Sequence, residues 1–231
     1  MIIMTTVFTA INTDRISFYK FKEHTLVKYN GNPMFVQSPW LNISCYGVPR
    51  RDKYHTSDDQ RLYIKLPVSR GERFATALGD LDEFMQREDV KQQLLGEKYQ
   101  KYDYCPLLKE PVDATDASRP PSVKLKLDVA HDSATIATEV YRVTSEGREL
   151  LKDIKTIDDF YNAAPYRSDV RVIFKLVKVW SQPPNLKNPT YGVTVKVMKM
   201  EVNQATRGGG NDCGFVDESD GVESEEVGSN Y

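Results

Sequence analysis

Strict two-residue alternation of apolar and polar side chains is the feature that most constrains this chain. In residues 61–66 (RLYIKL) three apolar residues alternate with Arg61, Tyr63 and Lys65, and residues 123–129 repeat the pattern. Because successive side chains of a β-strand point to opposite faces, each run predicts a strand with one face on a core and one in water. Such two-faced strands are typical of antiparallel sheets with one solvated face.

The remaining regular elements follow from the same kind of pattern. Helical periodicity is confined to residues 71–96, with a break expected near Gly79 or Asp89, and to a short helix that begins after Thr156 as its N-cap. Further strands are expected at 16–22, 25–29, 135–143, 169–180 and 190–202. The fold class predicted is therefore mainly β with inserted helices.

Charge is distributed unevenly along the chain. The formal net charge is −2, but residues 203–231 hold one basic and seven acidic residues, a balance of −6, against 30 basic and 26 acidic residues, a balance of +4, in residues 1–202. Six of the thirteen glycines also fall after residue 203, so we expect a disordered acidic tail there. We expect one folded domain over residues 1–202, with a loop or hinge at 106–121. A basic body with an acidic tail is typical of polyanion-binding proteins.

Motifs for catalysis, metal binding and membrane insertion are missing from the sequence. His24, His55 and His131 stand outside any metal-binding or triad motif, and neither a GxxxxGK phosphate loop nor a GxSxG turn occurs. The three cysteines lack CxxC spacing, which excludes a zinc site and a disulfide framework. Because no apolar run is long enough for a bilayer and no signal segment is present, we expect a protein that neither spans a membrane nor is secreted. The missing motifs predict a non-enzymatic, cofactor-free protein, and the cysteine pattern favours a reducing intracellular compartment.

Basic and aromatic side chains share the expected solvated faces of several strands. Single-stranded nucleic acid is held by bases that stack on exposed aromatic rings and by Lys and Arg side chains along the phosphates. The loop 46–55 is the densest segment of this type. The candidate contact residues are Phe18, Lys20, Tyr46, Arg50, Arg51, Lys53, Tyr54, Arg61, Tyr63, Lys65, Lys178, Trp180 and Tyr191.

A purely structural interpretation stays open for each of these residues, because Tyr and Lys are common on the solvated face of any sheet. Phe18 fits a core position equally well, and the burial tendency of tryptophan favours packing for Trp180. Lys175 and Lys178 fall on opposite faces of their strand unless a bulge intervenes. At most one of these two lysines is therefore expected at the same site.

The last two predicted strands carry a family resemblance. Residues 174–180 (FKLVKVW), a polar proline-containing loop and residues 191–197 (YGVTVKV) resemble the terminal strand pair of the OB-fold single-stranded DNA-binding proteins of nucleocytoplasmic large DNA viruses, which are related to the phage replication type. The resemblance implies an OB-fold-like antiparallel barrel with an inserted helical segment. It also implies an acidic tail that competes with DNA or recruits replication proteins. The tail residues concerned are Asp217, Glu218, Glu225, Glu226 and Tyr231.

Two main hypotheses follow from these observations, and a third possibility, a replication or transcription accessory that binds protein through its acidic tail without DNA affinity, stays open. The first is sequence-tolerant binding of single-stranded DNA in viral replication, repair or recombination, in the host cytoplasm, a virus factory or the nucleus. Its partners are single-stranded DNA and replication proteins, with no membrane partner, and homo-oligomerisation stays open. The alternative is a virion structural or assembly protein with a β-sandwich fold and no nucleic-acid role, which gives the same alternating strands. The two differ in whether basic and aromatic side chains converge on one concave face or scatter.

Overall fold

A computed structural model describes residues 5–111, 119–131 and 135–203. The predicted acidic tail beyond residue 203, with its five candidate residues, and the middle of the predicted hinge lie outside these ranges. The helices are α1 (Arg73–Gln86), α2 (Glu88–Leu95) and α3 (Ile157–Ala163). The strands are β1 (Thr5–Val7), β2 (Ile16–Phe21), β3 (His24–Tyr29), β4 (Asn32–Gln37), β5 (Leu41–Asn42), β6 (Tyr63–Pro67), β7 (Asp103–Cys105), β8 (Leu108–Lys109), β9 (Ser122–Leu127), β10 (Glu139–Thr144), β11 (Gly147–Leu150), β12 (Asp169–Ser181) and β13 (Thr190–Asn203).

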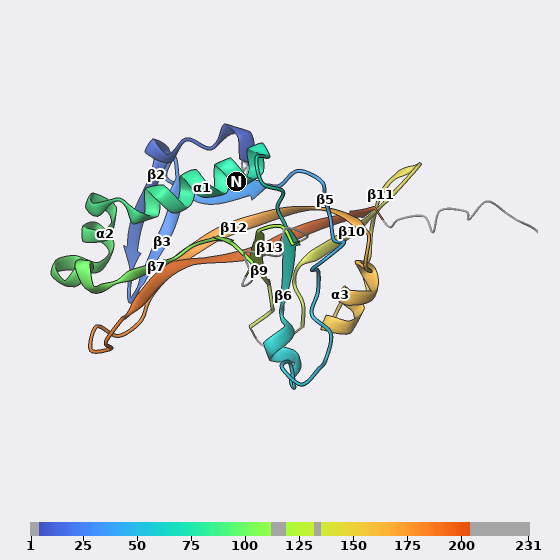
Figure 1. Ribbon diagram of the computed structural model, residues 1–231. Helices are drawn as coiled ribbons and strands as arrows, with labels where there is room; N and C mark the ends of the chain where they lie inside the picture. The colour runs from blue at the N-terminus through green and yellow to red at the C-terminus, as the bar shows by residue number, and fades with distance from the viewer. Residues whose placement is uncertain (1–4, 112–118, 132–134, 204–231) are drawn as a thin grey trace, which may run out of the picture.

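The long antiparallel hairpin of β12 and β13 is the centre of the fold, and its two arcs run across the molecule in Figure 1. Strands β3, β4 and β5 pair with β12, whereas β7, β9 and β10 pair with β13. Within the described residues all thirteen strands join one sheet, which curls into a half-barrel. The predicted mainly β fold class with inserted helices is thus confirmed. The pairs of β13 with β7, β9 and β10 are parallel, which local alternation alone does not indicate.

The apolar core follows the predicted alternation. Val170, Val172, Phe174 and Leu176 of β12 are buried, each at most 2 % exposed. Helix α1 covers this inner face, and the ring of its Phe74 meets the ring of Phe174 edge-on, 6.5 Å between centroids. We call the opposite side of the sheet, turned away from this core, the outer face.

Both predicted helical regions are confirmed. The first breaks at Arg87, whose backbone is extended (φ −55°, ψ 139°), so that α1 and α2 are separate. The second, α3, begins at a capping box: Thr156 Oγ1 accepts a hydrogen bond from the Asp159 backbone N–H, and the Asp159 carboxylate accepts one from the Thr156 N–H. Each of these helices, within the ranges the structure describes, is too short or too polar to cross a bilayer.

A β-bulge in β12 provides the exception under which Lys175 and Lys178 can share one face. The register with β13 shifts between Leu176 and Lys178, which adds one residue to β12. As a result Lys175, opposite Lys196, and Lys178, opposite Thr194, both lie on the outer face. The expectation that these two lysines point to opposite faces holds only for an unbulged strand.

Candidate nucleic-acid interface

A groove of about 640 Å³ opens between the loop 43–52, the outer face of β6 and the segment around the end of α3. We call it the tyrosine groove, because Tyr46, Tyr63, Tyr161 and Tyr166 all line it. Two of these residues were predicted from the sequence. The other two come from a part of the chain about 100 residues later, and only the tertiary fold brings them here.

The loop carrying Tyr46 is fixed to β6 by backbone pairing. The Gly47 N–H donates to the Lys65 carbonyl at 2.7 Å, and the Lys65 N–H donates back at 3.0 Å. Gly47 has φ +101°, a conformation that L side chains rarely adopt, so glycine is required at this close approach. The Tyr46 hydroxyl then donates to the Pro120 carbonyl at 2.9 Å. These bonds set the Tyr46 ring beside the side chain of Lys65.

A turn centred on Asp52 positions the next part of the groove. The Asp52 carboxylate accepts hydrogen bonds from the backbone N–H groups of His55 and Tyr54, both at 2.8 Å, which hold the pKa of Asp52 below its ordinary value. The His55 ring lies between Asp52 and Tyr63, with Nε2 2.9 Å from the Tyr63 hydroxyl. Burial, and then the charge of Asp52, raise the pKa of Tyr63. Tyr63 therefore stays a neutral phenol with a fixed ring.

Cationic side chains lie over all four tyrosine rings, and the Arg167 guanidinium is 5.5 Å from the Tyr166 centroid. Lys65 Nζ is 4.0 Å from the centroid of Tyr46, and Lys124 Nζ is 3.7 Å from that of Tyr63. The Arg50 guanidinium is 5.4 Å from the Tyr161 centroid, and its Nε donates to the Tyr161 hydroxyl at 2.6 Å. Each ring is thus paired with a positive charge at the range where cation–π attraction operates.

Lysines gather on β6 and β9 beside the groove and repel one another. Burial lowers the pKa of Lys124, and the nearby charges of Lys109, Lys126 and Lys65 lower it further. Burial likewise is the main cause that lowers the pKa of Lys65. Among the ion pairs of the described residues, none links Lys65, Lys124 or Lys126 to a carboxylate. This cluster carries positive charge that an anion would stabilise.

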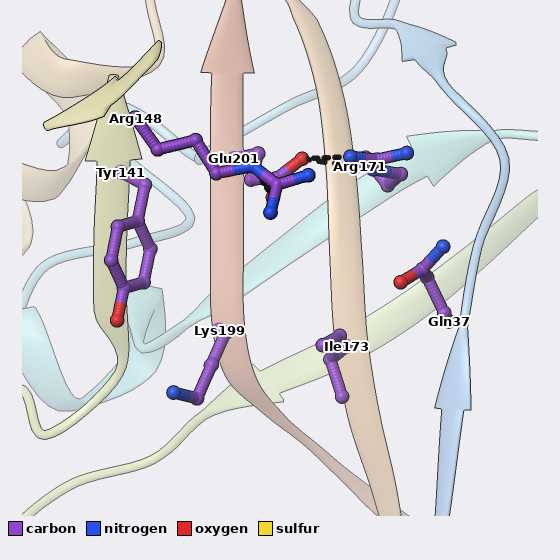
Figure 2. Close-up of a pocket in the computed structure, with 7 residues that line it drawn as sticks. All are labelled: Gln37, Tyr141, Arg148, Arg171, Ile173, Lys199 and Glu201. Atoms are coloured by element: carbon purple, nitrogen blue, oxygen red, sulfur yellow. Dashed lines mark hydrogen bonds and ion pairs between the residues drawn. The ribbon is translucent and has the colours of Figure 1, made fainter. Parts of the chain in front are cut away.

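A second cavity, of about 280 Å³, lies over β10, β12 and β13 and differs in charge (Figure 2). Arg148 Nε lies 2.7 Å from one Glu201 oxygen, and the Arg171 guanidinium binds the other. Lys199 Nζ is 2.9 Å from the Glu139 carboxylate. Its cations are therefore already paired, whereas the lysines of the tyrosine groove are not paired within the described chain.

The structure brings several predicted residues together. Tyr46, Arg50, Tyr63 and Lys65 line the tyrosine groove. The neighbouring loop holds three more predicted residues at the surface: Arg51, which donates to the Thr56 carbonyl, Lys53, and Tyr54, whose ring is 73 % exposed with Lys53 Nζ 4.9 Å from its centroid.

Arg61 corrects the sequence prediction, because it does not lie on the outer face beside Tyr63 and Lys65. Residues 58–61 wind into a short 3-10 helix, so β6 begins only at Tyr63 and the Arg61 side chain turns inward. Arg61 is 3 % exposed and donates to Asp58, to Asp158 at 2.7 Å and to the Pro49 carbonyl. It joins the loop to α3 instead of facing solvent.

Tyr191 and Phe18 are also packed in the protein. Tyr191 is fully buried, its hydroxyl donates to the Met85 carbonyl at 2.7 Å, and burial raises its pKa to about 12. Phe18 stacks on Phe84 of α1 with 6.2 Å between centroids. Because α1 covers that face of β2, the structural alternative stated for Phe18 is the one observed.

The last predicted residues lie away from the groove. The Trp180 ring packs on the β13 backbone at Gly192, where an added Cβ would come within 2.9 Å of Trp180 Cζ2. Lys20 is exposed on β2, and Lys178 is on the outer face with Nζ 3.4 Å from His24 Nδ1. Lys124 and Lys126 were not among the predicted contact residues, although alternation placed both on the outward side of β9. They belong to the site because they lie opposite Lys65 and Tyr63 of β6, and the sequence of one strand does not show which strand pairs with it.

Comparisons with known proteins return no matching family profile. An uncharacterized protein of Acanthamoeba polyphaga mimivirus is 23 % identical over 230 residues, which cover 84 % of this chain and 57 % of that protein. The chain therefore spans little more than half the length of that relative.

Similar solved structures are phage single-stranded DNA-binding proteins. The protein of bacteriophage Enc34 in complex with single-stranded DNA has a TM-score of 0.44 at 15 % identity, covering 80 % of this chain and 93 % of that chain. Its C-terminally truncated form has a TM-score of 0.43 at 12 % identity, covering 84 % and 97 %. The gp2.5 protein of bacteriophage T7 has a TM-score of 0.42 at 12 % identity, covering 82 % and 97 %.

Among the residues that the structure describes, no three His, Cys, Asp or Glu side chains come together as a metal-binding group. The aromatic rings of the tyrosine groove can stack on other planar groups, and its cationic side chains can bind anions.

Proposed function

We propose that the protein binds single-stranded DNA with little sequence preference, and that the tyrosine groove is where it does so. The observation that carries this proposal is the convergence of four tyrosine rings, each beside a cation, on one groove. Such convergence favours the DNA-binding hypothesis over the structural virion protein, for which these side chains would scatter.

The chemistry of the groove fits an unpaired strand. Bases that are not stacked in a duplex can stack on tyrosine faces, each for about 1 to 3 kcal/mol, and every base offers such a face. Phosphates placed beside Lys65, Lys124 and Lys126 would offset the mutual repulsion that lowers the pKa of Lys124. Binding of this kind is tolerant of sequence and sensitive to salt.

Titration of a labelled oligo-dT at several salt concentrations tests the proposal. We expect binding at low salt that weakens as salt rises, and an affinity about 5- to 150-fold lower for Tyr63→Ala, the loss of one stacked base. Tyr63→Phe, which keeps the ring and loses only the hydroxyl contact with His55, is the matched control and should bind nearly as well as the wild type. Absence of binding at low salt would refute the function itself.

We also propose that this non-enzymatic activity serves viral DNA replication, repair or recombination in a reducing intracellular compartment, as in the viral family that the terminal hairpin resembles. The free thiols of Cys45 and Cys105 agree with such a compartment. Tests are co-localisation of the protein with newly made viral DNA in infected cells, and a search for replication proteins that bind it. A uniformly extracellular or virion-only distribution would contradict this role.

The acidic tail is proposed to compete with DNA for the groove or to recruit replication proteins. The opposite charges of the tail and of residues 1–202 support competition. A chain that ends at Asn203 is expected to bind oligo-dT more tightly than the full chain, most of all at low salt. Equal affinities would exclude competition and leave recruitment, which a tail-dependent pull-down would measure.

A further inference from the structure

A second aromatic patch lies on the outer face of β2, away from the tyrosine groove. Tyr19 and Phe21 are each 50 % exposed, on the opposite side of the strand from the packed Phe18. Strand β2 pairs with β3, on the side of the β12–β13 hairpin away from β6 and β9 (Figure 1). Two half-exposed rings side by side on a sheet are available for stacking.

Lysines surround these two rings as they surround the tyrosines of the groove. Lys28 Nζ lies 4.4 Å from the Tyr19 centroid, and Lys22 Nζ lies 5.7 Å from the Phe21 centroid. Neither lysine forms an ion pair with a carboxylate in the described part of the chain. The patch therefore repeats the combination of ring and cation found in the tyrosine groove.

Strand register connects the two places across the outer face. Directly opposite one another on successive strands are Tyr63 of β6, Lys126 of β9, Lys196 of β13, Lys175 of β12 and Phe35 of β4. Register partners have their side chains on the same face of a sheet, so three lysines stand in a row between two rings. The middle one, Lys196, is ion-paired with Asp128 at 2.7 Å, whereas Lys126 and Lys175 have no such partner in the described chain. We call this row the lysine track.

The track continues to the patch on β2. The bulge in β12 keeps Lys178 on the outer face, opposite Leu26 of β3, and Leu26 is opposite Tyr19. From β6 to β2 the path crosses β9, β13, β12 and β3. These five strand intervals amount to about 24 Å at roughly 4.8 Å each.

We propose that a single DNA strand that extends beyond the tyrosine groove crosses the sheet along the lysine track and stacks bases on Tyr19 and Phe21. The inference rests on the proposed function and adds the path and the second anchoring point. Charge favours DNA over a second copy of this chain as the occupant, because two copies meeting at this patch would bring Lys22 and Lys28 of each against those of the other.

Oligonucleotide length separates the two anchoring points in an experiment. Oligo-dT of about 3 nucleotides and of about 20 nucleotides bracket the roughly 4 to 16 nucleotides that one such fold binds. For the variant Tyr19→Ala/Phe21→Ala we expect affinity for the longer oligonucleotide to fall by at least about 5-fold, and affinity for the shorter one to stay unchanged. Tyr63→Ala should weaken both.

A matched control variant removes an exposed apolar side chain elsewhere on the sheet. Leu150→Ala removes an exposed apolar side chain, 42 % exposed, from β11 and should change neither affinity. If the wild type binds neither oligonucleotide, the proposed function fails. If it binds both and the double variant weakens both equally or neither, the groove stands and the track is refuted. If sedimentation shows that the double variant loses self-association while keeping its affinity for the longer strand, the patch is a self-association surface and the track is again refuted.

Discussion

Removing the lysines beside the tyrosine groove should change the salt dependence of DNA binding by an amount that can be calculated. Lys65, Lys124 and Lys126 lie on two paired strands and lack carboxylate partners in the described chain, so each is available to one phosphate. For single strands the logarithm of the binding constant falls with the logarithm of salt concentration by about 0.7 per phosphate contacted. Replacing all three by Ala should therefore reduce the slope by about 2.

The consequence is large enough to measure by fluorescence anisotropy. Over a tenfold range of salt, the wild type should lose about 100-fold more affinity than the triple variant. Lys98→Ala/Lys101→Ala/Lys152→Ala removes the same charge from exposed positions away from the groove and should keep the wild-type slope. Identical slopes for the two triple variants would refute phosphate contact by the groove lysines, because general loss of charge would then explain both.

Three further predictions concern stability and pH. Gly192→Ala would bring a methyl group within 2.9 Å of the Trp180 ring and should lower the free energy of unfolding in urea by about 1 to 3 kcal/mol. Gly79→Ala in α1 has open space around it and should raise the free energy of unfolding by about 0.5 to 1 kcal/mol. Equal effects of the two substitutions would contradict the packing argument. The buried Asp82 carboxylate of α1 accepts hydrogen bonds from the Tyr104 hydroxyl and from the backbone N–H groups of Leu107 and Leu108. Asp82→Ala leaves these three donors unpaired and should lower the free energy of unfolding by about 3 kcal/mol, and a loss below about 1 kcal/mol would argue against this network. The pKa of Lys124 is lowered in the free protein, and a bound phosphate favours the protonated amine. The affinity for DNA should therefore fall as pH rises, and the fall should begin at a lower pH than for a lysine of ordinary pKa. Lys124→Ala should make the affinity less dependent on pH in alkaline titrations.

Local pattern was sufficient for most elements of the fold. Alternation placed β6, β9, β12 and β13, and a capping threonine placed α3, because these signals depend on neighbours within a few residues. Strand partners depend on loop closure over long stretches of chain. The parallel neighbours of β13 and the bulge before Lys178 were therefore not predictable from the sequence.

The candidate site was predictable in part, for a similar reason. Tyr46, Arg50, Tyr63 and Lys65 belong to one continuous segment and were predicted together. Tyr161 joins them because Ile157 and Phe160 pack α3 on the core and the buried Arg61 side chain binds Asp158 at its start. On β2 the prediction named Phe18, whereas the exposed rings are Tyr19 and Phe21. Helix α1 covers one face of β2, and this determines which rings of the strand are exposed. The sequence of β2 alone does not indicate which face is covered.

The position of the β12–β13 hairpin along the chain has a consequence for synthesis in the cell. Strands β3, β4, β5, β7, β9 and β10 each have a partner on residues 169–203, so they leave the ribosome well before their template. At about 5 to 20 residues per second, the first strands wait roughly 10 to 35 seconds with unpaired edges and exposed apolar faces. Nascent chains of this protein are therefore expected to need chaperones, and a fragment that stops before residue 169 should aggregate instead of keeping part of the sheet.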